Sequence, residues 1–169
     1  MKLPRVKLRA VDLSFLDTAP KRWTFEARLH APADAVFAAI SGDPGTWTWF
    51  PGMTSGRYEG DGPYGVGSRR VIRQGPSVYH ETIIAWETPR RWVYRVDETT
   101  VPMARALVEE WIVEPAGPGS LVCWRFAIDP RALFKAVGPL ASVGMGSVFR
   151  RAMRNLDRTL DRTRGGKES

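Results

Sequence analysis

The chain has 169 residues, a formal net charge of +7 at pH 7 and a single cysteine, Cys123. This length suffices for one domain with a sizeable core, and the apolar and charged fractions are ordinary for a soluble globular protein. No apolar run approaches the ~20 residues that span a bilayer, and the basic N-terminus lacks the apolar stretch of a signal peptide. A lone cysteine excludes an internal disulfide, so we expect a reduced, cytoplasmic protein.

The N-terminal part of the chain predicts an arm, a strand and two short helices. Residues 1–21 alternate only weakly, and we expect an arm that packs on the domain. Residues 23–29 alternate apolar and polar side chains, which predicts the first strand. Residues 31–40 have a proline and an aspartate in their first turn and an apolar stripe, as an amphipathic helix does. Residues 43–50 predict a second short helix with three aromatic side chains, of which at least one should border a pocket.

The middle of the chain alternates with a period of two residues between turn-like clusters of Gly, Pro and Asp. The predicted strands are residues 55–59, 68–74, 78–88, 91–96, 106–114 and 120–128. Because the connections are short, neighbouring strands should pair antiparallel as a meander. Residues 97–105 are expected to form a longer loop.

The C-terminal segment, residues 143–164, has apolar residues at helical spacing. A sheet with one wet face must bury the other, and this helix is the only long element that can cover it. We therefore expect an apolar cavity between sheet and helix. Residues 131–142 are expected to form a short helix or lid, and residues 165–169 a flexible tail.

Basic residues concentrate in the same predicted helix, and Asp157 and Asp161 are interleaved with them. These basic residues are Arg150, Arg151, Arg154, Arg158, Arg162 and Arg164. A solvated helix face with local ion pairs accounts for the pattern, and the alternative is a surface for nucleic acid or anionic membrane. Because the sequence has no nucleic-acid-binding fingerprint, we predict no nucleic-acid partner and no stable membrane insertion.

The two histidines, His30 and His80, do not belong to a Cys/Asp/Glu cluster with metal-ligand spacing in the sequence. The glycines at residues 60–67 do not precede a helix and are turn glycines, not a phosphate cradle. We therefore predict no metal and no cofactor.

Several short motifs, in this order, resemble the START-like superfamily of helix-grip proteins, and most closely the bacterial polyketide cyclase/dehydrase group. The resemblance covers residues 22–164. The motifs are Ala31-Pro32-Ala33-Asp34-Ala35-Val36-Phe37, Asp43-Pro44-Gly45-Thr46-Trp47, Gly65-Val66-Gly67-Ser68-Arg69-Arg70, His80-Glu81-Thr82-Ile83, Pro89-Arg90-Arg91-Trp92-Val93-Tyr94-Arg95 and the helix at residues 149–160.

This resemblance implies an α+β fold for residues 22–164: a curved seven-stranded antiparallel sheet wrapped around the C-terminal helix, with two short helices near the N-terminus. Members of the superfamily bind lipids, sterols, polyketides and other apolar molecules, and some are enzymes. The fold alone therefore does not determine the function. We expect a monomer or homodimer.

With the family's strand register, one side-chain face of each strand points into the cavity. The ligand-binding residues expected on this basis are Trp47, Phe50, Arg70, Ile72, Tyr79, Glu81, Ile83, Tyr94, Trp111, Trp124, Phe126, Met145, Phe149 and Met153. This mostly aromatic set suits a hydrophobic ligand with an oxygen atom to anchor. Cys123 should lie on the opposite face from Trp124.

Arg70 and Glu81 are the candidate catalytic residues, because both should point inward on adjacent strands. In a functional role, Arg70 holds a ligand carboxylate or enolate while Glu81 accepts a hydrogen bond or acts as a base. In a structural role, the two form an ion pair at the cavity rim.

The leading hypothesis is a protein that binds a hydrophobic small molecule, such as a lipid, a fatty acid or an aromatic or polyketide-like compound. The alternative is an aromatase/cyclase or dehydratase that acts on a poly-β-ketone in the same cavity. A third interpretation is membrane or partner binding through the basic helix.

Overall fold

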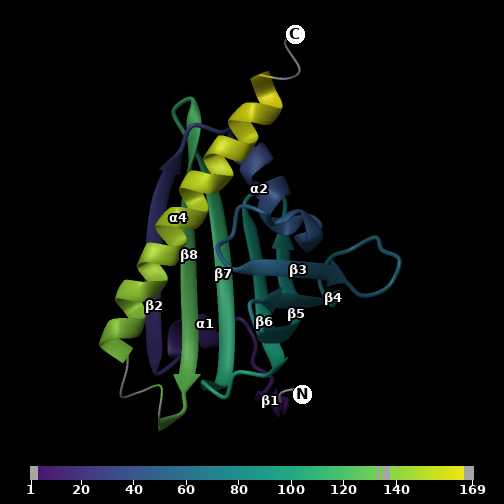
Figure 1. Cartoon of the computed structure of the whole chain (residues 1–169), viewed down its shortest axis with the longest axis vertical. Helices are drawn as coiled ribbons and strands as arrows, with labels where there is room; N and C mark the ends of the chain where they lie inside the picture. Colours follow the sequence, from purple (N-terminus) through teal and green to yellow (C-terminus); the bar gives the residue numbers. More distant parts are fainter. Residues whose placement is uncertain (1–3, 133, 135–137, 166–169) are drawn as a thin grey trace.

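One antiparallel sheet and one long helix dominate the computed structural model, which describes residues 4–132, 134 and 138–165 (Figure 1). The eight-stranded sheet has the order β2-β8-β7-β6-β5-β4-β3, and β1 pairs with β6 off this path. The strands are β1 (Val6–Lys7), β2 (Lys21–Leu29), β3 (Met53–Tyr58), β4 (Arg69–Gln74), β5 (Ser77–Glu87), β6 (Arg91–Thr99), β7 (Ala104–Ala116) and β8 (Gly119–Pro130). The helices are α1 (Phe15–Thr18), α2 (Ala33–Ser41), the 3₁₀ turn η1 (Pro44–Thr46) and α4 (Gly138–Gly165).

The predicted α+β helix-grip architecture is confirmed. The seven predicted strands are present in a sheet whose consecutive members β3 to β8 pair as a meander, and β2 closes the edge against β8. Helix α4 lies diagonally across one face of this sheet, in front of β2 and β8 (Figure 1). No helix within the described ranges is both long and apolar enough to cross a membrane.

Four boundaries differ from the sequence prediction. Strand β6 runs on to Thr99 and β7 begins at Ala104, so the loop expected at residues 97–105 shrinks to residues 100–103. Helix α4 begins at Gly138, before the predicted residue 143, because a proline is tolerated in the first turn of a helix. The second short helix is only the single turn η1, which ends before the aromatic residues.

Some predicted segments fall largely outside the described residues. The short helix or lid expected at residues 131–142 includes 133 and 135–137, and the tail expected at 165–169 includes 166–169; these lie outside the described part of the chain. The remainder of the lid segment, from residue 138, belongs to α4.

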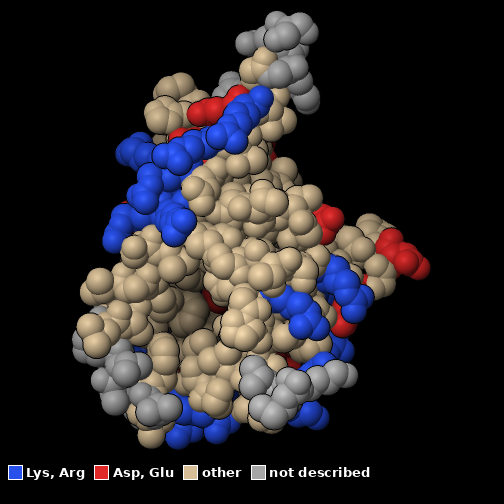
Figure 2. Space-filling view, viewed as in Figure 1, with Lys and Arg blue, Asp and Glu red and all other residues tan. Residues whose placement is uncertain are grey.

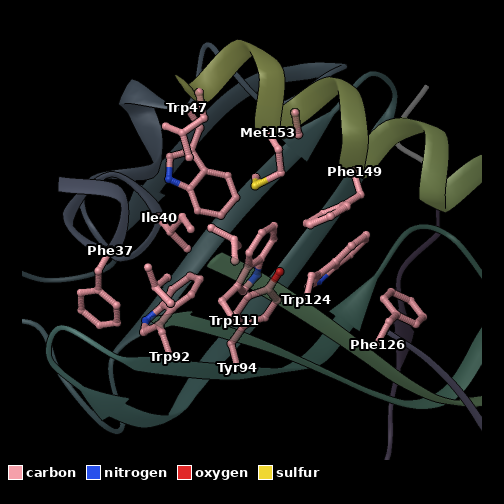
Figure 3. Close-up of a cluster of buried hydrophobic side chains, with 14 of the residues drawn as sticks. Phe37, Ile40, Trp47, Trp92, Tyr94, Trp111, Trp124, Phe126, Phe149 and Met153 are labelled. Atoms are coloured by element: carbon pink, nitrogen blue, oxygen red, sulfur yellow. The ribbon is translucent and has the colours of Figure 1, made fainter. Parts of the chain in front are cut away.

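The face of the sheet under α4 holds the main hydrophobic core. Figure 3 shows Phe149 and Met153 pointing from α4 into a group of aromatic side chains on the sheet, where Trp111 and Trp124 lie side by side. Ala152 and Leu156 complete the buried stripe of the helix. Large rings bury much apolar surface each, so this aromatic layer is the main source of hydrophobic stabilisation.

The opposite face of the sheet is covered by the N-terminal arm, which the sequence did not predict to contain a helix. Phe15 and Leu16 of α1 are buried in a second cluster, against small side chains of the sheet. These side chains are Ala85, Val93, Ala106, Val108 and Ala127. Strand β1 extends the contact by pairing with the end of β6, where β7 no longer pairs.

A network of ion pairs joins the N-terminal arm to this outer face of the sheet. Glu110 is 1% exposed and accepts hydrogen bonds from Arg91 at 2.6 Å and from Arg125 at 2.7 Å. Arg125 also donates to the side chain of Asp17 in α1 at 2.7 Å. A buried carboxylate needs such partners, so the arm contributes to the shell that holds Glu110.

Asp157 connects α4 to the segment between β2 and α2. One of its oxygens accepts hydrogen bonds from the backbone N–H groups of His30 and Ala31, and the other lies 2.8 Å from His30 Nδ1. The carboxylate therefore fixes the helix at the end of the first long strand.

Candidate functional site

A cavity of about 330 Å³ lies between α4 and the sheet. Figure 2 shows it as a hollow with acidic atoms at its floor. The lining residues are Trp47, Phe50, Met53, Arg70, Ile72, Gln74, Tyr79, Glu81, Tyr94, Met103, Leu107, Glu109, Trp124, Phe126, Phe134, Ala141, Gly144, Met145 and Val148. The walls are therefore mainly aromatic and aliphatic, with few polar groups, as in small-molecule sites generally.

Most of the residues expected to bind ligand line this cavity. They are Trp47, Phe50, Arg70, Ile72, Tyr79, Glu81, Tyr94, Trp124, Phe126 and Met145. Of the three aromatic residues after η1, Trp47 and Phe50 border the cavity, whereas Trp49 is buried in the core. Cys123 is half-buried and alternates with Trp124, and thus lies on the other face of β8.

Four expected residues lie deeper, in the packed core, and are not part of the cavity lining: Ile83, Trp111, Phe149 and Met153. Trp124 stacks on Trp111 at 5.4 Å and on Phe149 at 5.9 Å between ring centroids, and Trp124 is the ring of these three that borders the cavity. Strand alternation assigns the face of a residue but not its depth, which explains the difference.

Glu109 is the most informative residue that the sequence analysis missed. It lies on β7 between Leu107 and Trp111 with the same two-residue spacing, so the alternation already placed it on the inner face. The other lining residues that were missed are Met53, Gln74, Met103, Leu107, Phe134, Ala141, Gly144 and Val148. Several of these lie in loops or on α4, where strand alternation gives no signal.

Arg70 and Glu81 form a buried ion pair in the cavity wall. They are register partners on β4 and β5, and Arg70 Nε donates to Glu81 Oε2 at 2.5 Å. Their side chains are only 1% and 5% exposed. Burial raises the pKa of Glu81 above its ordinary value, although the nearby guanidinium opposes this rise.

Three aromatic rings surround the Arg70 guanidinium. Its carbon lies 4.8 Å from the ring centroid of Trp47, 4.4 Å from that of Trp92 and 4.4 Å from that of Tyr94. Such contacts stabilise a desolvated cation. Arg70 Nη1 is buried and has no hydrogen-bond partner among the described residues.

Glu109 is held by two donors in the cavity. Its Oε2 accepts hydrogen bonds from Tyr94 Oη at 2.6 Å and from Trp124 Nε1 at 2.9 Å. Burial, followed by the negative charge of Glu81, raises the pKa of Glu109 to about 7. A carboxyl group with this pKa exists in both protonation states at neutral pH, as proton donors and acceptors in active sites do.

Two apolar side chains at the start of α4 are exposed, and neither of them lines the cavity. Leu140 is 76% exposed and Val143 is 70% exposed, next to the lining residues Ala141 and Gly144. An added Cβ at Gly144 would meet nothing within 4 Å.

Away from the cavity, the described residues include one His/Asp cluster, formed by His30, Asp157 and Asp161. Both oxygens of Asp157 already accept protein hydrogen bonds, and His30 is exposed. The role of this cluster is structural, because it links α4 to the connection between β2 and α2.

Comparison of the sequence with models of protein families identifies the family of this chain. The family model "Polyketide cyclase / dehydrase and lipid transport" matches residues 22–161. The chain belongs to this family. A comparison with curated proteins finds no match.

Solved structures of several other proteins share the fold. A START superfamily protein from Mycobacterium smegmatis has a TM-score of 0.69 at 12% identity, covering 84% of this chain and 98% of the other. The protein TTHA0849 from Thermus thermophilus has a TM-score of 0.68 at 14% identity, with coverage of 85% and 99%. Ginseng major latex-like protein 151 from Panax ginseng has a TM-score of 0.64 at 10% identity, with coverage of 82% and 96%. These likenesses concern the fold.

Proposed function

We propose that this family member binds a hydrophobic small molecule in the cavity between α4 and the sheet. The main supporting observation is a cavity of about 330 Å³ whose walls are mostly aromatic and aliphatic. A protein of this size ordinarily packs such a space closed, because an empty apolar cavity destabilises the fold. An aromatic or polyketide-like compound suits the ring-rich lining better than a plain alkyl chain does.

Titration with N-phenyl-1-naphthylamine, a neutral probe whose fluorescence rises in apolar surroundings, tests this function. We expect saturable binding that Val148→Phe weakens at least ~10-fold, since Val148 lines the cavity and the added ring occupies its space. Val143→Phe is the matched control, because Val143 is on the same helix but 70% exposed. Thermal unfolding of both variants verifies that they are folded.

Equal affinity in the wild type and in folded Val148→Phe, or the absence of saturable binding, would contradict the proposal. A cytoplasmic location, a monomeric or dimeric state and the absence of a nucleic-acid partner remain predictions alongside it. Size-exclusion chromatography with light scattering measures the oligomeric state directly.

A second candidate function is cyclisation or dehydration of a poly-β-ketone, which the protonation behaviour of Glu109 favours. Glu81 is engaged by Arg70, whereas the pKa of Glu109, raised to about 7 by burial, suits proton transfer at neutral pH. On this proposal, Glu109→Gln lowers turnover of a poly-β-ketone thioester by at least ~10²-fold and leaves probe binding intact. Wild-type turnover no faster than the uncatalysed reaction would remove this candidate for that substrate.

A further inference from the structure

The charges that line the cavity are unequal in number. Among the described lining residues, one cation, Arg70, accompanies two carboxyl groups, Glu81 and Glu109. The remaining ionisable lining groups are the phenols of Tyr79 and Tyr94, whose pKa values burial raises, so both stay neutral at physiological pH. With Glu109 ionised, the cavity therefore has one negative charge in excess.

Arg70 is already committed to protein contacts. Its Nε donates to Glu81, and three aromatic rings lie 4.4 to 4.8 Å from its guanidinium carbon. Glu81 already offsets the charge of this cation, so a ligand carboxylate that approached Arg70 would lie beside the Glu81 carboxylate and be repelled by it. Arg70 Nη1 has no hydrogen-bond partner among the described residues, but this atom is buried. Because the two charges compensate each other, Arg70 gives the cavity no net positive charge that would attract a ligand carboxylate.

Glu109 is the carboxyl group that retains hydrogen-bonding capacity for a ligand. The hydrogen bonds it receives from Tyr94 and Trp124 both end on Oε2. None of the described residues donates to Oε1, and Glu109 lines the cavity. An ionised carboxylate has room for further donors, and an ammonium group beside it forms the stronger, charge-assisted hydrogen bond.

From this arrangement we infer that the cavity selects apolar ligands whose polar end donates hydrogen bonds to Glu109, an amine above all and a hydroxyl next, and that it rejects free carboxylic acids. The inference rests on the proposed ligand-binding function and specifies its ligand class. It replaces the fatty acid among the candidate ligands with an aromatic amine or alcohol. A protonated amine restores the charge balance that Arg70 alone does not provide.

Competition among three compounds with the same ring system tests the inference. The compounds are 1-naphthylmethylamine, 1-naphthalenemethanol and 1-naphthylacetic acid, each displacing N-phenyl-1-naphthylamine at about pH 8. We expect the amine to compete at least ~10-fold better than the acid, with the alcohol between them, because like charges in one cavity repel. At about pH 5.5 the preference for the amine over the alcohol should shrink, since Glu109 is then mostly protonated.

Two variants assign the preference to Glu109. Glu109→Gln should reduce the ratio of amine to acid affinity at about pH 8 at least ~5-fold, since the amide keeps the shape of the side chain and removes its charge. Asp161→Asn, which removes one negative charge from the exposed face of α4, should leave the ratio unchanged. An unaltered ratio in folded Glu109→Gln would overturn the assignment.

The outcomes distinguish this inference from the proposed function. If the acid competes as well as the amine, the inference fails while ligand binding stands. If none of the three compounds displaces the probe, but the probe binds and Val148→Phe weakens its binding, the inference fails and the proposed ligand-binding function stands. If the probe itself does not bind, both fail.

Discussion

At the scale of single residues, burial gives Glu109 its chemical character. Its carboxyl group accepts from Tyr94 and Trp124, yet removal from water and the charge of Glu81 outweigh these donors and raise its pKa to about 7. The native state therefore binds a proton more tightly than the unfolded chain, in which the ordinary value of 4.5 applies.

This difference predicts how stability depends on pH. Between about pH 4.5 and 7 the native state holds more protons than the unfolded state, so the contribution of Glu109 to stability decreases as the pH rises through that window. Glu109→Gln should remove this loss of stability at high pH. The unfolding free energy of the variant minus that of the wild type should therefore be about 1–3 kcal/mol larger at pH 8 than at pH 4.5. Urea unfolding at both pH values measures it. An identical pH dependence in the two proteins would contradict the raised pKa.

Arg70 and Glu81 provide a second prediction at this scale. Both side chains are almost completely excluded from water, so removing one partner leaves the other charge buried and unpaired. Arg70→Met and Glu81→Gln should therefore each lower the free energy of unfolding by about 3–5 kcal/mol. The double variant Arg70→Met/Glu81→Gln should lose less than the sum of the two single losses. Additive losses in urea unfolding would show that the pair is not coupled.

At the scale of elements, alternation along the strands predicted which face each inner residue occupies. Trp124 and Phe126 line the cavity as expected, and Glu109 follows the same rule although it was overlooked. Alternation does not predict how far from the cavity a side chain lies. Trp111 is covered by Trp124, and this is an effect of three-dimensional packing. The helix in the N-terminal arm could not be predicted either, because a four-residue helix such as α1 is stabilised by tertiary contacts and not by its own propensity.

The contacts of α1 make the arm part of the stable fold. Phe15 is 6% exposed and covers small side chains of the outer face. Phe15→Ala should lower the free energy of unfolding by about 3–5 kcal/mol through lost burial and the cavity it leaves. Val66→Ala, at a side chain that is 67% exposed, should change it by less than about 0.5 kcal/mol. Equal effects of the two changes on the free energy of unfolding would show that the packing of the arm does not stabilise the fold.

The attachment of α4 also depends on one side chain. Asp157→Ala removes the acceptor of the His30 and Ala31 backbone N–H groups and should destabilise the protein by about 1–2 kcal/mol. Asp161→Ala, one turn later on the same helix and exposed, is the control and should have a smaller effect. Thermal unfolding compares the two, and a larger loss for Asp161→Ala would contradict the role of Asp157.

At the scale of the whole molecule, one long helix separates two different surfaces. Its outer side carries the exposed arginines that Figure 2 shows in blue, interleaved with acidic residues. Its inner side closes the core at Phe149 and Met153 and borders the cavity at Met145 and Val148. The net charge of +7 thus lies largely outside the site, and the cavity itself is neutral or negative.

Methionine methyl groups report most directly on whether a ligand occupies this cavity. Met53, Met103 and Met145 line it, whereas Met153 is 2% exposed in the core. In protein labelled with ¹³C at methionine methyls and assigned by single Met→Leu variants, saturation with N-phenyl-1-naphthylamine should shift the NMR signals of the three lining methionines far more than that of Met153. Saturable probe binding that leaves those three signals unmoved would contradict ligand binding in the cavity.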